Sequence, residues 1–219
     1  MALTAANVSQ VRDVAVASPE TLGLGMLQAD PHAWRLDRST QLAAVSDALA
    51  DGIAAATNLR TRFGDLSPEQ IARALRLPVE TTDSDPMVGS IWRFAEYRPR
   101  PPRIVLYSRG LGPLERSLTG ARAAQLLGQA TARDVFIAHE LYHHIESVRP
   151  EMPIARRYQP TLFRMGNWHW RTGIAALAEI AAGAFAQSLL DLPCHPKALD
   201  FVAVDAIAVA KAATDARAG

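Results

Sequence analysis

The chain lacks the features that mark nucleic-acid-binding, disulfide-bonded, membrane-spanning and secreted proteins. Its formal net charge is only +1, so we expect neither a nucleic acid nor a membrane surface as a partner. It contains one cysteine, Cys194, which cannot form an internal disulfide bond and suits a reducing cytoplasm. The most apolar long stretch, residues 174–190, is interrupted by Glu179 and is a poor candidate for a membrane span. Residues 1–18 lack the basic head and the unbroken apolar core of a secretory signal.

What remains is the composition of an ordinary globular protein. Hydrophobic residues make up 49% of the 219 residues and charged residues 21%, which is enough to build one substantial core. Residues 1–36 are broken up by proline and glycine and show no clear periodicity, so we expect an N-terminal arm with at most one short helix. Residues 37–219 are expected to form a single domain.

The periodicity of this domain predicts an α+β fold that is mostly helical. Between its helices, three short segments rich in β-branched or aromatic residues predict a small, mainly antiparallel three-stranded sheet. Capping boxes at Ser67/Gln70 and Thr131/Asp134 predict two of the helix starts. The expected strands are Val79–Thr82, Ile91–Tyr97 and Arg103–Ser108, and the expected helices cover 39–58 (capped by Ser39 or Thr40), 67–76, 112–128, the stretch after Thr131, 171–190 and 198–216. The strand around Ile104–Tyr107 is expected to present an edge to an extended peptide.

The helix after Thr131 carries the sequence His139-Glu140-Leu141-Tyr142-His143. At about 3.6 residues per turn, the two histidines lie on one face of the helix, as two ligands of one metal ion require. Glu140 lies beside them, where its carboxylate can take a proton from a metal-bound water. The surrounding residues are apolar, so this part of the helix is expected to be buried and its polar groups to need partners. The pattern therefore predicts a Zn²⁺ site with hydrolytic chemistry.

A catalytic zinc site needs a third protein ligand and an open coordination position. Within residues 174–186 every residue except Glu179 is apolar or glycine. A buried, unpaired carboxylate there would cost several kcal/mol, so coordination explains both Glu179 and the motif. Glu146, one turn after His143, and His169 remain alternative ligands. An exposed Glu179 on a thin polar side of the helix is the other interpretation of that residue.

The segment 151–170 is expected to be a long connection, and connections of this length are often functional. It contains several side chains that could stabilise the oxyanion of a hydrolytic transition state. We expect His169 or Tyr158 to take this role, with Arg164 as a further candidate.

Three stretches resemble the ImmA/IrrE-type metallopeptidases, small bacterial proteins with an HExxH helix and a later helix that bears a glutamate. They are residues 67–82, residues 103–110 with the motif helix at 138–143, and residues 179–193, and they lie between about 65 and 195 of this chain. The resemblance implies a zincin-like domain in which His139, His143 and Glu179 are zinc ligands and Glu140 is the general base. The family ending commonly has a second acidic residue and an asparagine, where this chain has Ala181 and Gly183.

Together these observations predict a cytoplasmic, zinc-dependent metallopeptidase with Glu140 as the general base on a zinc-bound water. The resemblance implies a protein or peptide substrate inside the cell, such as the transcriptional regulator that members of the family cleave. The alternative is a non-catalytic regulatory or partner-binding protein that retains the same fold.

Overall fold

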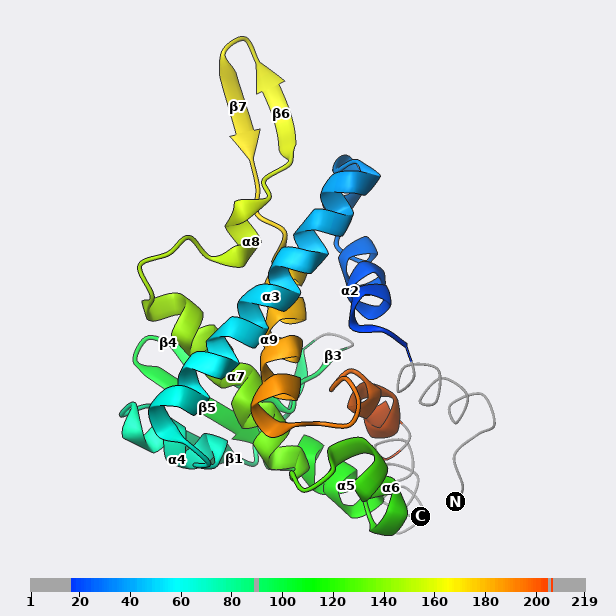
Figure 1. The fold of residues 1–219 in the computed structure, drawn as a ribbon, viewed down its shortest axis with the longest axis vertical. Helices are drawn as coiled ribbons and strands as arrows, with labels where there is room; N and C mark the ends of the chain where they lie inside the picture. The colour runs from blue at the N-terminus through cyan, green and yellow to red at the C-terminus, as the bar shows by residue number, and fades with distance from the viewer. Residues whose placement is uncertain (1–16, 89–90, 205, 207–219) are drawn as a thin grey trace.

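The computed structural model describes residues 17–88, 91–204 and 206 (Figure 1). Helices dominate the fold, and the strands form one three-stranded sheet and two small hairpins. In chain order the elements are α2 (Pro19–Gln28), η1 (Ala33–Arg35), α3 (Arg38–Phe63), α4 (Pro68–Ala74), β1 (Val79–Thr82), β2 (Met87–Val88), β3 (Ile91–Trp92), β4 (Ala95–Pro99), β5 (Pro102–Tyr107), α5 (Ser108–Ser117), α6 (Gly120–Leu127), α7 (Ala132–Val148), α8 (Ile154–Arg157), β6 (Thr161–Met165), β7 (Trp168–Arg171) and α9 (Ala175–Leu190).

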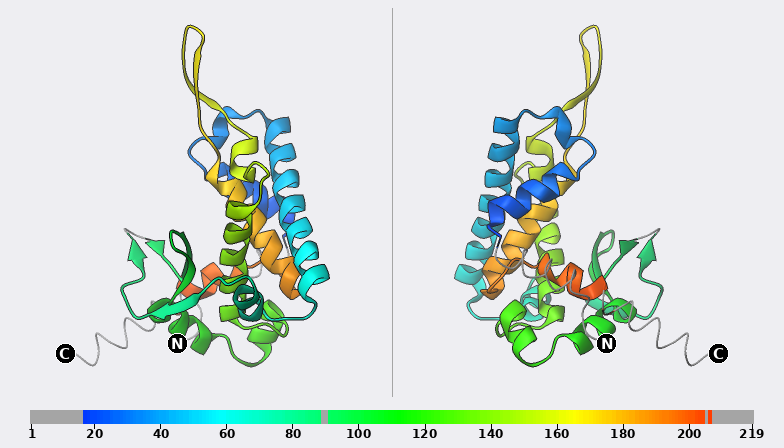
Figure 2. Two further views of the ribbon diagram at one scale, coloured as in Figure 1. Left: turned by 90° about the vertical axis from the view of Figure 1, so that its left-hand side faces the viewer. Right: turned by 90° about the vertical axis from the view of Figure 1, so that its right-hand side faces the viewer.

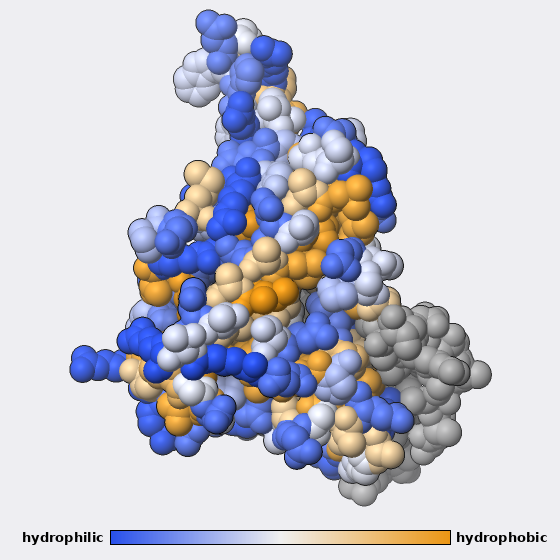
Figure 3. Space-filling view, in the orientation of Figure 1, coloured by the Kyte–Doolittle hydropathy of each residue, from blue (hydrophilic) through white to orange (hydrophobic). Residues whose placement is uncertain are grey.

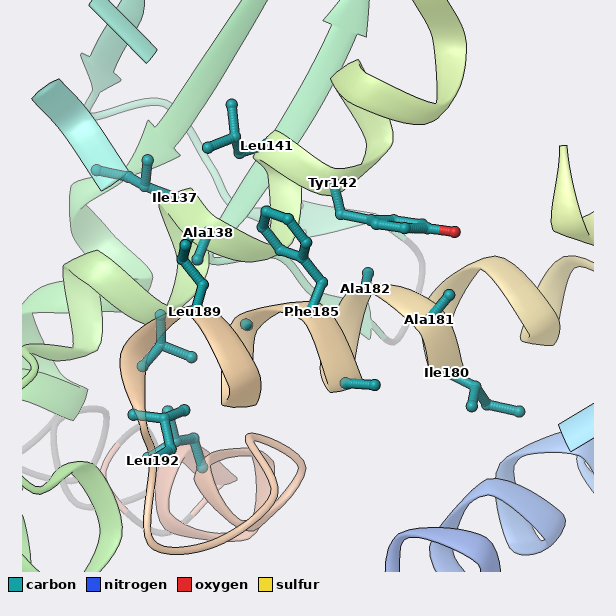
Figure 4. Close-up of a cluster of buried hydrophobic side chains, with 14 of the residues drawn as sticks. Ile137, Ala138, Leu141, Tyr142, Ile180, Ala181, Ala182, Phe185, Leu189 and Leu192 are labelled. Atoms are coloured by element: carbon teal, nitrogen blue, oxygen red, sulfur yellow. The ribbon is translucent and has the colours of Figure 1, made fainter. Parts of the chain in front are cut away.

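The core is built on α9, which packs against α3 on one side and α7 on the other. Alanine and glycine on α9 allow the neighbouring backbones to approach closely. A Cβ atom added at Gly52 of α3 would lie 2.1 Å from the backbone oxygen of Ala181, so this crossing requires glycine. On the other side of α9, Phe185 packs against Tyr142 of α7, and both side chains are fully buried (Figure 4). The metal-ligand motif therefore lies on a helix that the core holds in place.

The three-stranded sheet has the order β1-β5-β4 and is mixed. The prediction of a mostly helical α+β fold with a small sheet is confirmed, but only one of its two strand pairings is antiparallel. β4 and β5 form an antiparallel hairpin, whereas β1 pairs with β5 in parallel, because the chain inserts β2, β3 and β4 before it returns beside β1. The prediction that Ile104–Tyr107 forms an edge is wrong, since β5 is the central strand. The edge beside α7 is β4.

Helix starts follow the predicted caps in two of three cases. Both capping boxes, Ser67/Gln70 and Thr131/Asp134, are present, which confirms the predicted starts of α4 and α7. The N-cap of α3 is Asp37, whose carboxylate accepts hydrogen bonds from Thr40 and Ser39, so the predicted caps are partners of the true one. The single helix expected over 112–128 is two helices, α5 and α6, and Gly120 (φ 54°) lies at the break.

The segments at both ends of the chain are described in part. Residues 1–16 of the predicted arm lie outside the described residues, while α2 packs against α3 and α9 with Leu27 fully buried. Residues 198–204 are helical, as expected, and most of the remainder of the predicted helix 198–216 lies outside the described residues. Within the described part of the chain, no helix combines the length and apolar character needed to cross a membrane.

Candidate metal centre

His139 and His143 lie one turn apart on α7, and their Nε2 atoms are 3.3 Å apart. The two rings meet edge to face, with centroids 5.1 Å apart, so both nitrogens point to the same place. About a fifth of each side chain is exposed, at 23% for His139 and 20% for His143. The helix thus presents two partly buried nitrogen donors toward one point.

Glu179 reaches the same point from α9. Its Oε2 lies 3.1 Å from Nε2 of His139, and its Oε1 lies 3.5 Å from Nε2 of His143. One ligand atom from each of the three residues lies within 4.8 Å of the others. The structure therefore brings together the three residues that the sequence singled out, although they are separated by 40 positions along the chain.

Burial and the contacts among the three residues set their pKa values. Burial raises the pKa of Glu179, but the hydrogen bond with His139 and the charge interactions with both histidines outweigh it and lower that pKa to about 2. Burial, together with the neighbouring His139, lowers the pKa of His143 to about 4. For His139, burial lowers the pKa, but the hydrogen bond and charge of Glu179, with the charge of Glu140, raise it overall. Two imidazole nitrogens and an ionised carboxylate form a donor set that zinc accepts, so the residues fit the ion.

Glu140 is buried beside the three candidate ligands, with only 9% of its surface exposed. Its Oε2 accepts a hydrogen bond from the backbone N–H of Tyr97 in β4 at 2.7 Å. Burial is the main reason that its pKa is raised. The side chain is thus held in one place by the sheet and does not compete for the position of the metal ligands.

A cavity of about 210 Å³ opens in front of these residues. Its apolar wall includes Met26 of α2, Trp92 of β3, Phe94 between β3 and β4, and Phe136 of α7. Its polar side chains include His139, Glu140, Glu179, His195, Lys197 and Asp200. The carboxylates of Glu140 and Glu179 and the imidazoles of His139 and His195 therefore share one solvent-accessible space.

His195 is the residue of this cavity that the sequence did not point to. It follows α9, is 6% exposed, and its Nδ1 accepts a hydrogen bond from the backbone N–H of Lys197 at 3.1 Å. Burial, with the nearby charge of His139, lowers its pKa to about 4, so the ring is neutral near pH 7 and carries its proton on Nε2. That nitrogen lies over Gly183, where a Cβ atom would be 2.7 Å away. The sequence signal for this arrangement is Gly183, one turn after Glu179, because a residue without a Cβ atom leaves room for the His195 ring against α9.

The two residues predicted to stabilise an oxyanion are placed elsewhere. Tyr158 follows α8, and its hydroxyl donates to Asp47 of α3 at 2.7 Å. His169 lies on β7, in the exposed hairpin formed by β6 and β7, which projects away from the crossing of α7 and α9 (Figure 1). Arg164, on β6, lies in the same hairpin. None of the three belongs to the described lining of the cavity, so the structure does not bring Tyr158 or His169 to the candidate site.

The carboxylate of Glu146, the alternative ligand, makes its hydrogen bond away from the candidate site. Its Oε1 accepts a hydrogen bond from the backbone N–H of Ile154 at 2.8 Å and so helps to fix the chain after α7. His144 lies one turn after Glu140 on α7, and its Nδ1 lies 3.1 Å from the hydroxyl of Tyr97. Neither residue joins the group formed by His139, His143 and Glu179.

The arrangement can bind a cation, hold a base and offer a neutral hydrogen-bond donor within one cavity. Those are the parts that metal-assisted hydrolysis of an amide or ester requires. Comparisons with models of protein families, with curated proteins and with solved structures give no match.

Proposed function

We propose that this protein is a zinc-dependent metallopeptidase of the ImmA/IrrE type. The observation that carries the proposal is the convergence of His139 and His143 on α7 with Glu179 on α9 to within 4.8 Å, with Glu140 beside them in the same cavity. In this assignment the first three residues hold Zn²⁺ and Glu140 is the general base. When bound, zinc supplies Lewis acidity, which polarises a carbonyl group and lowers the pKa of water.

Glu140 handles the proton. Its carboxylate is buried, which raises its pKa toward the range in which a general base works best near neutral pH. The hydrogen bond from Tyr97 leaves the second carboxylate oxygen, Oε1, to take a proton from the attacking water and pass it to the leaving amine.

His195 replaces Tyr158 and His169 as the donor for the carbonyl oxygen of the substrate. Its ring is neutral, its protonated Nε2 lies over Gly183, which also lines the cavity, and Lys197 fixes its orientation through Nδ1. The same hydrogen bond argues against His195 as a ligand of the metal, because Nδ1 accepts and Nε2 therefore carries the proton. A fixed donor of this kind stabilises the negative charge that develops in the transition state.

The shape of the site favours a peptide as the substrate. β4 is the edge strand beside α7, and its residue Ala95, together with the preceding Phe94, lines the cavity. An extended peptide can pair with such an edge through backbone hydrogen bonds. We further propose a cytoplasmic location and a protein substrate, which agrees with a single, buried cysteine.

Two measurements test the proposal. Purified protein should contain about one zinc ion per chain by elemental mass spectrometry. Cells that produce the active protein should contain protein fragments that cells producing the Glu140→Gln variant lack. Zinc without any difference in fragments would favour the non-catalytic regulatory protein, and protein that binds no zinc would refute the metallopeptidase.

A further inference from the structure

The hairpin of β6 and β7 stands apart from the body of the protein. It projects at one end of the long axis, beyond α8 and the start of α3, and all three ribbon views show it clear of the other elements (Figures 1 and 2). The space-filling view shows the same isolation (Figure 3). A two-stranded hairpin without a covering layer is only marginally stable in water, so this one is expected to have a partner.

The register gives the hairpin two different faces. Phe163 pairs with Trp170, and Met165 pairs with Trp168. Directly paired residues lie on the same face, and so do residues two apart in a strand. These four side chains therefore form one apolar face, which we call the apolar hairpin face.

The apolar hairpin face is open to solvent. The exposed fractions are 61% for Phe163, 68% for Met165, 82% for Trp168 and 68% for Trp170. Exposed apolar side chains gathered on one face in this way mark an interaction site.

The opposite face and the flanking chain are cationic. Arg164 pairs with His169 on the other side of the hairpin. Between Glu151 and Glu179 the sequence has four arginines and no aspartate or glutamate. Of these four, Arg157 is paired with Asp51, and the others are Arg156, Arg164 and Arg171.

The base of the hairpin adds a further tryptophan and arginine. Arg35 of η1 donates a hydrogen bond to the backbone oxygen of Thr161 at 3.2 Å. Its guanidinium lies 4.5 Å from the ring centroid of Trp34, which is 70% exposed. Aromatic side chains beside arginine are therefore concentrated at this end of the protein, although the net charge of the chain is only +1.

We propose that the hairpin docks the protein onto an anionic lipid bilayer, with the apolar hairpin face lying in the boundary between headgroups and acyl chains. Tryptophan prefers this boundary, because its ring is apolar and its N–H is polar. Arginines on the opposite face then meet the phosphates and the water, as in an amphipathic element that lies in the interface. The net charge of the whole chain led us to expect no membrane partner. The proposal differs because the arginines are concentrated at one end of the protein, and a net charge does not record that.

Two other occupants fit less well. A second copy could cover the face, but four side chains of this size offer on the order of 500 Å², below the ~800 Å² per partner that a stable dimer buries. Single-stranded nucleic acid stacks its bases on aromatic rings while cations contact the backbone along the same groove. Here Arg164 and His169 lie on the face opposite to the rings.

The test is sedimentation of the full chain with vesicles of phosphatidylcholine alone and of phosphatidylcholine with an equal amount of phosphatidylglycerol. We expect the protein to bind the anionic vesicles, and to bind less as salt is added. The double variant Trp168→Ser/Trp170→Ser should weaken binding by about tenfold or more, because it removes two large apolar anchors. Arg164→Gln should weaken it by about fivefold.

Val204→Ser is the matched control, because Val204 is exposed to 64% on the helical segment 198–204, away from the hairpin. This variant should bind anionic vesicles as the original protein does. A second measurement needs no variant: acyl-chain-brominated lipids should quench the tryptophan fluorescence of the original protein if the rings enter the boundary. The zinc content and circular dichroism of each variant report whether it is folded.

Three results would overturn the proposal. One is failure of the original protein to bind anionic vesicles. Another is equal binding to neutral and anionic vesicles, or equal loss of binding in Val204→Ser. The third is a concentration-dependent dimer that disappears in the double tryptophan variant while vesicle binding is absent, which would assign the apolar hairpin face to a second copy.

Discussion

The carboxylate of Glu140 accepts a hydrogen bond from the backbone N–H of Tyr97 at 2.7 Å, which joins the motif helix α7 to the edge strand β4. The same side chain is therefore a link between two elements and, in the proposed mechanism, the base. These two roles can be separated by substitution, because only the second requires a carboxylate.

Glu140→Gln should keep the fold and the metal but lower turnover by about two to four orders of magnitude. A glutamine retains an oxygen that can accept from Tyr97, but it cannot take a proton. Glu140→Ala should in addition destabilise the protein by about 1–3 kcal/mol, because it leaves the N–H of Tyr97 without its acceptor. Urea unfolding and peptide hydrolysis, measured on both variants, separate the two effects. Undiminished hydrolysis in Glu140→Gln would remove Glu140 from the role of base.

Glu179→Ala should abolish stoichiometric zinc binding, because it removes the only carboxylate that contacts both His139 and His143 among the described residues. His169→Ala is the control and should bind zinc normally, since His169 lies in the exposed hairpin. Elemental analysis and thermal shifts with added zinc measure the difference. At a free zinc concentration of 100 times Kd, the original protein should gain about 2.7 kcal/mol, and Glu179→Ala should gain much less. Equal gains in the two variants would exclude Glu179 as a ligand.

His195→Phe should lower kcat by about a hundredfold to a thousandfold and leave the zinc content unchanged. Phenylalanine keeps a ring over Gly183 but has no N–H to donate to the carbonyl oxygen. A change in KM alone would indicate that His195 only shapes the cavity. Loss of zinc together with activity would instead make His195 a ligand.

Local signals in the sequence were sufficient to predict the motif helix and the third candidate metal ligand, Glu179. Thr131 and Asp134 form the capping box that starts α7, and the spacing of His139 and His143 places them on one face. Glu179 could be identified because an isolated carboxylate in an apolar helix needs a partner. These are short-range or single-residue arguments, and the structure brings the residues together as expected.

The remaining features depend on contacts that are distant in the sequence. The parallel pairing of β1 with β5 depends on how the chain of β2, β3 and β4 returns beside β1, and no local sequence pattern predicts that path. His195 enters the cavity from the loop after α9, where Lys197 fixes its ring. The segment 151–170 is predicted to be a long connection, but most of it forms α8 and the hairpin of β6 and β7, whose alternation produces one apolar face.

Asp51→Asn should make the protein less stable at neutral pH and its stability less sensitive to acid. Asp51 is 6% exposed and lies 2.8 Å from Arg149 and 2.6 Å from Arg157, and it accepts from the hydroxyl of Tyr142 at 2.7 Å. Burial opposes the shift, but the hydrogen bonds from Arg149 and Tyr142 and the two arginine charges lower the pKa of Asp51 overall. Ionised Asp51 therefore stabilises the folded state above the pKa of the unfolded chain, and this stabilisation is lost as the pH falls through the lower, folded pKa.

We expect Asp51→Asn to cost about 3 kcal/mol near pH 7, because it leaves the mostly buried guanidinium of Arg149 with only the more distant Glu146, at 3.8 Å, as an anionic partner among the described residues. The matched control is Asp47→Asn, one turn earlier on α3, whose exposed carboxylate accepts only from Tyr158 among the described residues. It should change stability by about 0.5 kcal/mol or less. Urea unfolding from neutral to acidic pH measures both. Parallel curves for Asp51→Asn and the original protein would show that Asp51 does not govern the acid response.

Gly52→Ala should destabilise the protein by about 3 kcal/mol or more, although alanine is the better helix former. The added Cβ would lie 2.1 Å from the backbone oxygen of Ala181 and 2.9 Å from the backbone nitrogen of Phe185, so α3 and α9 would have to separate. Gly25→Ala on α2 is the control, because no neighbouring atom in the part of the chain that the structure describes lies within 4 Å of the added Cβ. It should stabilise the protein by about 0.5–1 kcal/mol, the ordinary helix preference of alanine over glycine. Since α9 carries Glu179, separation of the helices should also weaken zinc binding in Gly52→Ala but not in Gly25→Ala, and equal zinc affinity in both would show that the crossing does not position the ligand.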